Sequence, residues 1–342
     1  MSTGAGQAYL LTRLAIFNAR RRRPDQLRAL LELDTAGLCR QFGLDAAHLD
    51  ERSLDLFEQI QLQNWLNELN TLLRPLAGAE RAFLVQWARR YEVLNLKALI
   101  KGKLNGLSRS EIQASLFTLP GFLSLDHEPL LNADDVTELL RRLLDTPYAQ
   151  LARAALRRFE EQQDPFLLDA SLDQQFYSGL SHRVTRLSQH ERGEMRNLVG
   201  RLIDRHNLVW MLRYRHNYRL PAAQAMYLSI SGGLHLTGER LRGVLEVLTL
   251  QEAIQRLPQS MQVLVGKADN LVAIQDRLRF DLQNQAERVL RQSHGALAGV
   301  FAYLLLRYYE INTINAILQA RVARLPQELQ EQALFGWYAE VA

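Results

Sequence analysis

One helical sequence recurs along this chain, and the recurrence limits the folds open to it more than any other feature. The stretch RYEVLNLKALIKGKLNGL, residues 90–107, returns as YYEINTINAILQARVARL at residues 308–325. With Tyr91 placed on Tyr309, glutamate follows in both, and apolar positions continue to match apolar positions. Matches that keep register through charged and apolar positions alike favour a true repeat over a chance likeness between amphipathic helices.

A further version of the helix lies between these two, as DRHNLVWMLRYRHNYRL at residues 204–220, where Asn207 falls on Asn95. We call the three versions the first, second and third copies in chain order. Upstream of each copy, three positions four apart are all apolar or aromatic. They are Phe83, Trp87 and Tyr91, then Met195, Val199 and Ile203, then Phe301, Leu305 and Tyr309. The sequence therefore predicts a threefold repeat of about 110 residues, with domains at 1–125, 126–237 and 238–342.

The repeated unit is predicted to be helical, and the whole chain to be all-α. Apolar residues recur at spacings of three and four, Glu, Gln, Arg and Ala fill the gaps, and the prolines fall largely between such stretches. Residues 83–104, 195–216 and 301–322 are each expected to form one helix.

A helical wheel of the first copy has two apolar faces, so this helix is expected to pack on both sides. The broad face holds Phe83, Leu84, Trp87, Tyr91, Leu94, Ala98 and Gly102, and the narrow face holds Val93, Leu96 and Ile100. Asn95 and Asn207 are poor helix formers and need hydrogen-bond partners if buried. An internal bond that fixes helix packing is favoured over a contact with another protein, and Thr313 occupies the same place in the third copy.

The remaining features describe a globular protein of mild charge. Its 342 residues carry a formal charge of +4, and the single cysteine, Cys39, has no partner for an intrachain disulfide. We expect no signal peptide, because no basic segment precedes a long apolar run near residue 1. The longest apolar run, residues 296–306, is shorter than the ~20 residues of a membrane span and predicts a buried helix.

Motifs for enzyme chemistry are missing from the sequence. It has no GxxxxGK[ST] loop, its HERGE at 190–194 lacks the second histidine of HExxH, and its histidines have no metal-ligand spacing. We therefore expect no catalytic residue, no cofactor and no metal. The run RRRR at 20–23 could touch phosphate or anionic lipid, although an exposed basic face is the favoured interpretation.

Taken together, the motifs resemble the C subunit of archaeal and bacterial V/A-type ATPases, which corresponds to the d subunit of the eukaryotic vacuolar enzyme. The resemblance rests on YLLTRLAIFNARRRR, on YEVLNLKALIKGK with the turn LPG, on DRHNLVWMLRYR with GG, and on YYEINTINAILQAR. Together these cover nearly the whole length. The sequence departs from the family pattern at His206, Trp210 and Thr313.

The resemblance implies three similar helical domains in a funnel around a pseudo-threefold axis. It implies a non-catalytic socket, peripheral to the membrane on its cytoplasmic face, between central-stalk subunits of the D and F type and the membrane rotor ring. Such a socket serves ATP-coupled ion transport, and whether the ion is a proton or sodium is left open. Neither nucleic acid nor a small-molecule substrate is expected as a partner.

An open socket would need a surface for the stalk. The basic residues Lys97, Lys101, Lys103, Arg213, Arg215 and Arg321 stand at the C-terminal ends of the repeated helices, where cations favour the helix dipole. They are candidates for a basic rim that binds an acidic stalk end, although dipole pairing and solvation explain any one of them. The alternative function is a helical-repeat module that binds nucleic acid or other proteins through arginine-rich faces. Acidic residues interleaved with the arginines argue against it.

Overall fold

Helices make up all the regular secondary structure in the computed structural model, which describes residues 4–162, 165–247, 249–293 and 295–335. The all-α prediction is therefore confirmed. The longer helices are α1 (Gly4–Arg20), α4 (Glu51–Leu73), α5 (Gly78–Ala88), α6 (Arg90–Leu104), α10 (Ala149–Gln162), α11 (Pro165–Thr185), α12 (Gln189–His216), α17 (Leu271–Gln292) and α18 (Ala296–Val322).

Shorter helices connect them. They are α2 (Pro24–Ala29), α3 (Thr35–Phe42), α7 (Arg109–Ala114), α8 (Glu128–Leu131), α9 (Val136–Arg142), α13 (Ala222–Tyr227), α14 (Gly238–Leu245), α15 (Leu250–Gln255), α16 (Gln259–Val265) and α19 (Gln327–Phe335). The 3₁₀ turns are η1 (Leu30–Glu32), η2 (Ala46–His48) and η3 (Leu143–Asp145).

Local sequence signals set several of the helix starts. The side chains of Asp50 and Asn270 accept from the backbone N–H groups of Ser53 and Ala273, which begins α4 and α17. Ser108 and Glu111 form a reciprocal capping box at the start of α7. Polar N-caps therefore fix the starts of these helices.

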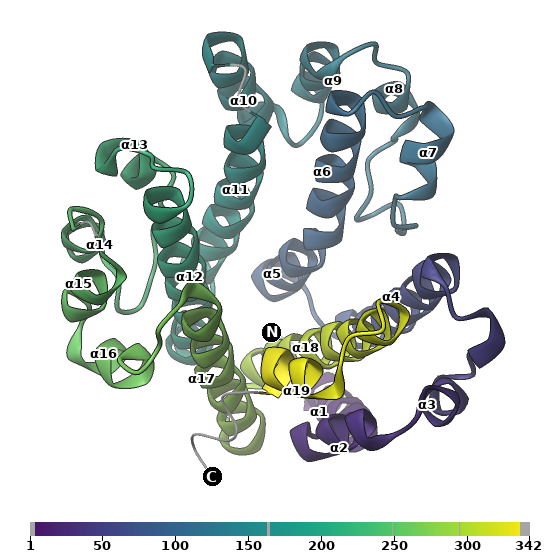
Figure 1. Cartoon of the computed structure of the whole chain (residues 1–342). Coiled ribbons are helices and arrows are strands. Elements are labelled where there is room, and N and C mark those ends of the chain that lie inside the picture. Colours follow the sequence, from purple (N-terminus) through teal and green to yellow (C-terminus); the bar gives the residue numbers. More distant parts are fainter. Residues whose placement is uncertain (1–3, 163–164, 248, 294, 336–342) are drawn as a thin grey trace. The chain divides into compact units, whose positions relative to one another are not determined.

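The chain divides into two compact units. One comprises Met1–Ala77 with Lys267–Ala342, and the other comprises Gly78–Gly266. In the first unit α18 lies beside α4, α17 and α1 (Figure 1). The indole of Trp65 is fully buried there and its Nε1 donates to the carbonyl oxygen of Leu304 at 3.4 Å. Division into domains at 125 and 237 stays a prediction.

In the second unit α11 packs against α10 and α12, and also against α5 and α6 (Figure 1). The ring centroids of Trp87 and Phe176 lie 6.5 Å apart at the contact between α5 and α11. Gly102 permits the close approach of α7, because a Cβ at this position would lie 2.4 Å from the side chain of Ile112. Chain segments far apart in sequence thus share one core.

The first copy differs from the expected continuous helix. Residues 83–104 are divided at Arg89, whose ψ of −4° separates α5 from α6. The backbone N–H groups of Arg89 and Val93 donate to Val85 O and Arg89 O, both at 3.0 Å, so α-helical bonds continue across the junction. Leu94, predicted on the broad apolar face, is 43% exposed, whereas Tyr91 and Gly102 of the same face are buried. Helices α12 and α18 run unbroken over the corresponding residues.

The long apolar run at residues 296–306 lies within α18, and all its residues except Ala296 are buried, as predicted. A helix buried on all sides needs no polar stripe. Within the described ranges, none of the helices combines the length and apolar character that a bilayer crossing requires.

Candidate functional site

The repeated helices end in the same way. After α6, α12 and α18 the chain passes through a residue with positive φ, at 67° for Gly106, 55° for Arg219 and 52° for Arg324. This left-handed geometry is uncommon for arginine and typical of a helix C-terminus.

The residue that follows each left-handed position is a leucine. The backbone N–H groups of Leu107 and Leu325 donate at 2.9 Å to the carbonyl oxygens of Gly102 and Ala320. Leu220 donates to Tyr214 at 2.8 Å, with one extra residue in its turn. The helix end that the sequence pattern aligned is therefore the same local structure at all these places.

A buried carboxylate occupies the same position of each repeated helix. Glu92 is 0% exposed, Asp204 2% and Glu310 2%. A buried carboxylate needs hydrogen-bond donors or a counter-charge. Each of the three accepts a hydrogen bond from the backbone of another segment, and so holds that segment against the helix.

In the first two copies the segment comes from downstream in the chain. Glu92 Oε1 accepts from Leu125 N at 2.9 Å and lies 2.9 Å from His127 Nε2. The carboxylate of Asp204 accepts from the N–H groups of three successive residues, Leu234, His235 and Leu236, at 3.1, 2.7 and 3.0 Å.

Asp204 is held at a close approach of backbone. Burial raises the pKa of its carboxyl group, and the three N–H bonds oppose that rise. A Cβ on Gly233 would lie 2.3 Å from Asp204 Oδ1, so only glycine fits this position without a shift.

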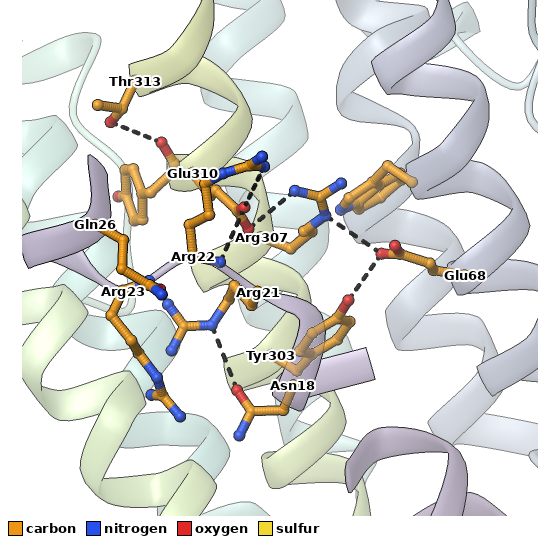
Figure 2. A network of polar contacts seen from close by, with 12 residues as sticks. Asn18, Arg21, Arg22, Arg23, Gln26, Glu68, Tyr303, Arg307, Glu310 and Thr313 are labelled. Carbon is orange, nitrogen blue, oxygen red and sulfur yellow. Dashed lines mark hydrogen bonds and ion pairs between the residues drawn. The ribbon is translucent and has the colours of Figure 1, made fainter. Parts of the chain in front are cut away.

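In the third copy the segment comes from the beginning of the chain. Glu310 Oε1 accepts from Arg22 N at 3.1 Å, and Arg307 Nη1 lies 2.9 Å from Glu310 Oε2. Figure 2 shows the carboxylate of Glu310 between Arg22 and Arg307, with Glu68 beyond Arg307. The N-terminal residues thus provide for α18 the contact that downstream residues provide for α6 and α12.

The Arg307 guanidinium links two helices of the first unit. Its Nε lies 3.6 Å from Glu68 Oε2 on α4, and the hydroxyl of Tyr303 donates to the same oxygen at 2.8 Å (Figure 2). Burial lowers the pKa of Arg307, but Glu310 and Glu68 outweigh it, so the pKa is raised overall. Burial raises the pKa of Glu68, which Arg307 and Tyr303 oppose.

The asparagines of the first two copies bond internally, as favoured from the sequence. Asn95 accepts from Phe117 N at 2.7 Å and donates to Phe117 O at 3.0 Å. Asn207 makes the same pair of bonds with Ile230, at 2.9 and 2.8 Å. In the third copy the hydroxyl of Thr313 donates to Tyr309 O at 2.9 Å, within its own helix.

Half of the predicted basic rim makes matching contacts with carbonyl groups at the ends of short helices or turns. Lys103 Nζ donates to Leu131 O at 2.8 Å, and Arg215 Nε donates to Leu245 O at 2.8 Å. Arg321 Nη2 donates to Leu31 O and Leu33 O at 2.8 and 3.0 Å. These carbonyls lie at or just after the ends of α8, α14 and η1, where a cation is favoured.

The other three rim residues lie in different settings. Lys97 pairs with Asp169 and Asp173 on α11, at 3.1 and 2.9 Å. The guanidinium of Arg213 lies over the ring of Trp210, 4.9 Å from its centroid, and Lys101 is exposed. The contacts thus differ from one rim residue to the next, and their binding of a partner stays a prediction.

The arginine run at 20–23 is only in part the exposed basic face that the sequence favoured, because Arg20 and Arg23 are exposed and Arg21 and Arg22 are not. Arg21 is buried and pairs with Glu287, while Arg23 Nη1 lies 3.0 Å from Glu287 Oε2. With Arg22 bound to Glu310, carboxylates neutralise most of the run, because its turn leads directly into the packed interior of the first unit.

Sequence reasoning singled out the cations and asparagines but not the buried acids Glu92, Asp204 and Glu310. Their signal was present, since the register that aligns Asn95 with Asn207 also aligns Glu92 with Asp204. Among the described residues, no group of three or more His, Cys, Asp or Glu could hold a metal ion.

Comparison with known proteins places these helices in a family. A family model described as "ATP synthase (C/AC39) subunit" matches residues 10–332. Similar proteins include the C subunit of the A-type ATP synthase from Methanosarcina barkeri, 22% identical over 82% of this chain and 77% of that protein. The corresponding C subunit from Haloferax volcanii is 23% identical over 98% of this chain and 99% of its own length. With a match that spans all three copies of the repeated helix, this chain belongs to the ATP synthase C/AC39 subunit family.

Proposed function

We propose that this protein is a non-catalytic coupling subunit of a rotary V/A-type ATPase. In this role it is a socket that joins the central stalk to the membrane rotor ring, on the cytoplasmic face of the membrane, and serves ATP-coupled ion transport. The observation that carries the proposal is the family match over residues 10–332. The partners are central-stalk subunits of the D and F type and the ring.

The internal contacts support a mechanical role. A socket that couples two partners has to transmit torque without local yielding, so its connecting segments need to be fixed to its long helices. Buried carboxylates at Glu92, Asp204 and Glu310 bind such segments through backbone N–H groups. We propose that three similar domains, each centred on one copy, surround a pseudo-threefold axis and grip the stalk.

The exposed residues at the helix ends are the proposed contact with the stalk. Leu107, Tyr218 and Leu325 are 44%, 52% and 46% exposed, just after α6, α12 and α18. Exposed apolar groups beside cations fit a partner with an acidic rim and an apolar centre. Lys101 is the predicted rim residue whose charge is most available, and Arg213 is partly exposed.

The nucleic-acid alternative finds less support. Phosphate binding needs unpaired cations on a continuous face. Instead, Arg21, Arg28, Arg109, Arg142 and Arg307 each pair with a carboxylate. Arginines paired in this way add little to an electrostatic footprint for nucleic acid.

Reconstitution tests the proposal. An ATPase complex assembled without this chain should hydrolyse ATP while ion pumping into vesicles is lost, and adding the purified chain should restore pumping. A rotor ring in vesicles should also retain the stalk only when the chain is present. Full pumping without the chain, or no effect of adding it, would contradict the coupling role.

A further inference from the structure

A cavity of about 130 Å³ lies within the second unit, where the junction between α5 and α6 faces α11. Its polar lining comes from α5 and the junction that follows it, from α11, and from the turn before α10. These residues are Gln86, Arg89, Tyr148, Gln175, Gly179 and Arg183. Apolar lining from Val93, Leu172 and Phe176 completes the walls.

Two guanidinium groups line this cavity without a carboxylate partner among the described residues. Arg183 Nη1 donates to Gly179 O at 3.1 Å, within its own helix, and neither Arg183 nor Arg89 forms an ion pair there. Burial lowers the pKa of Arg183, and the positive charges of Arg89 and Arg186 lower it further. Like charges that share a partly buried site repel one another unless an anion lies between them.

The third copy shows how the same arginine is neutralised elsewhere in this chain. Arg307 holds the position of Arg89 in the repeat register, three residues before the buried carboxylate. There the guanidinium lies between Glu310 and Glu68, at 2.9 and 3.6 Å.

In the first copy both of those contacts are replaced. Glu92, in the place of Glu310, accepts instead from the backbone of Leu125 and faces His127. Helix α11 contributes Gly179 and Arg183 to the cavity lining, and neither of them is acidic. Gly179 leaves room for the uncharged amide of Gln86, whose Nε2 lies 3.0 Å from the position that a Cβ on Gly179 would take.

The hydroxyl group of Tyr148 also faces a need for a hydrogen-bond acceptor at the cavity. The oxygen of Tyr148 is buried and has no hydrogen-bond partner among the described residues. A buried hydroxyl left in this state is unfavourable, and a bound acceptor oxygen would relieve it.

We propose that this cavity binds a small oxyanion of the phosphate class, held by the guanidinium groups of Arg89 and Arg183 and by the hydroxyl of Tyr148. Arginine presents a planar set of N–H donors that matches the oxygens of phosphate, and it stays charged when partly buried. A cavity of about 150 Å³ accommodates a ring of six carbon atoms, so the present volume suits inorganic phosphate and is too small for a nucleotide. The inference stands independently of the coupling role.

Calorimetry and thermal unfolding of the full chain test this site, with inorganic phosphate as the probe and sodium chloride at matched ionic strength as the reference. We expect saturable binding in the millimolar range and a rise in Tm of about 3 °C at 20 mM phosphate. Arg89→Gln and Arg183→Gln should each weaken binding at least tenfold. Arg196→Gln removes the same charge from an exposed position of α12 and should bind phosphate as the wild type does.

The phosphate-free proteins separate a binding role from a structural one. If the arginines repel each other across an empty site, Arg89→Gln should not lower Tm in chloride. Arg183→Glu should place a carboxylate beside Arg89 and abolish the phosphate response while the fold is kept. Sulfate should act like phosphate, and acetate should bind at least tenfold more weakly. An equal phosphate response in the wild type and the Arg89→Gln, Arg183→Gln double variant would overturn the proposal, as would no saturable response to phosphate.

Discussion

The backbone N–H of Arg22 donates to the carboxylate of Glu310 at 3.1 Å, although the two residues are 288 positions apart in the chain. In the first and second copies, the matching acids accept from residues 33 and 30 positions downstream. The third copy is contacted by residues 22–33 instead. The N-terminal segment therefore completes the C-terminal copy, and the first unit contains both ends of the chain.

Replacement of Glu310 by glutamine tests how much this carboxylate contributes to the free energy of unfolding. The side chain of Glu310 is 1% exposed, and its loss of charge leaves Arg307 with only the more distant Glu68. Removing one member of a buried ion pair typically costs about 3–5 kcal/mol, so urea unfolding should show a loss of that size. Glu331→Gln, which removes a pairing of Arg28 at the surface, should cost less than about 1 kcal/mol. Equal losses in the two variants would show that the buried pair has no special role.

Gly233→Ala tests the close approach of backbone to Asp204. The new Cβ would lie 2.3 Å from Asp204 Oδ1 and 2.9 Å from Leu236 O, so the three N–H bonds to the carboxylate have to distort. We expect a loss of about 1–3 kcal/mol in unfolding free energy. Gly243 in α14 has open space around its Cβ position, so Gly243→Ala should be neutral or stabilise the protein by up to about 1 kcal/mol. A Gly233 variant as stable as the Gly243 variant would contradict this account.

Stability should fall in mild acid because of His206. Burial lowers the pKa of its imidazole to about 3, with the charges of Arg205 and Lys97 adding to the effect. Between pH 6.5 and 3 the unfolded chain binds a proton at this position and the folded chain does not, so stability decreases as pH falls through that window. From pH 7.5 to 5 the loss from this one group is about 2 kcal/mol.

A histidine variant isolates that loss from the titration of other groups. His206→Phe preserves the ring contacts with Tyr177 and Trp210, at 4.5 and 6.1 Å. Denaturant unfolding at pH 7.5 and 5 should show a smaller acid loss for this variant than for the wild type, by about 2 kcal/mol. His190→Phe changes an exposed histidine of the same helix and should keep the wild-type slope. An unchanged slope in His206→Phe would exclude the buried imidazole as the cause.

The predicted rim residues should not behave alike. Arg321 donates to Leu31 O and Leu33 O, so Arg321→Gln should cost about 1–3 kcal/mol through carbonyl groups left without a donor. Lys101 is exposed, so Lys101→Glu should lower the unfolding free energy by less than about 1 kcal/mol, through the helix dipole. If Lys101 belongs to a rim for an acidic stalk, this reversal should slow association with purified stalk subunits, most at low salt. The same association rate at every salt concentration would remove Lys101 from the rim.

Particular residues show which contacts the sequence could predict. Asn95 and Asn207 were expected to bond internally because a buried amide must find partners, and they do. The division of the first copy at Arg89 was missed because the ψ of one residue cannot be read from periodicity, and Leu94, placed on the apolar face, is exposed. The arginine run was taken as exposed because its acceptors, Glu287 and Glu310, lie at the other end of the chain.

The sequence by itself determined the helices, the copies and the family, because these depend on residues close together in the chain or on a pattern that repeats. Local spacing sets amphipathicity, and caps set helix ends. Tertiary structure alone decided which segment each buried acid holds, and it alone joined residues 22–33 to the last copy. Among the described residues, it also left Arg89 without the carboxylate that Arg307 has. The physical reason is that a buried charge is satisfied by whichever donor or counter-ion the packed chain brings near, and sequence separation places no limit on that choice.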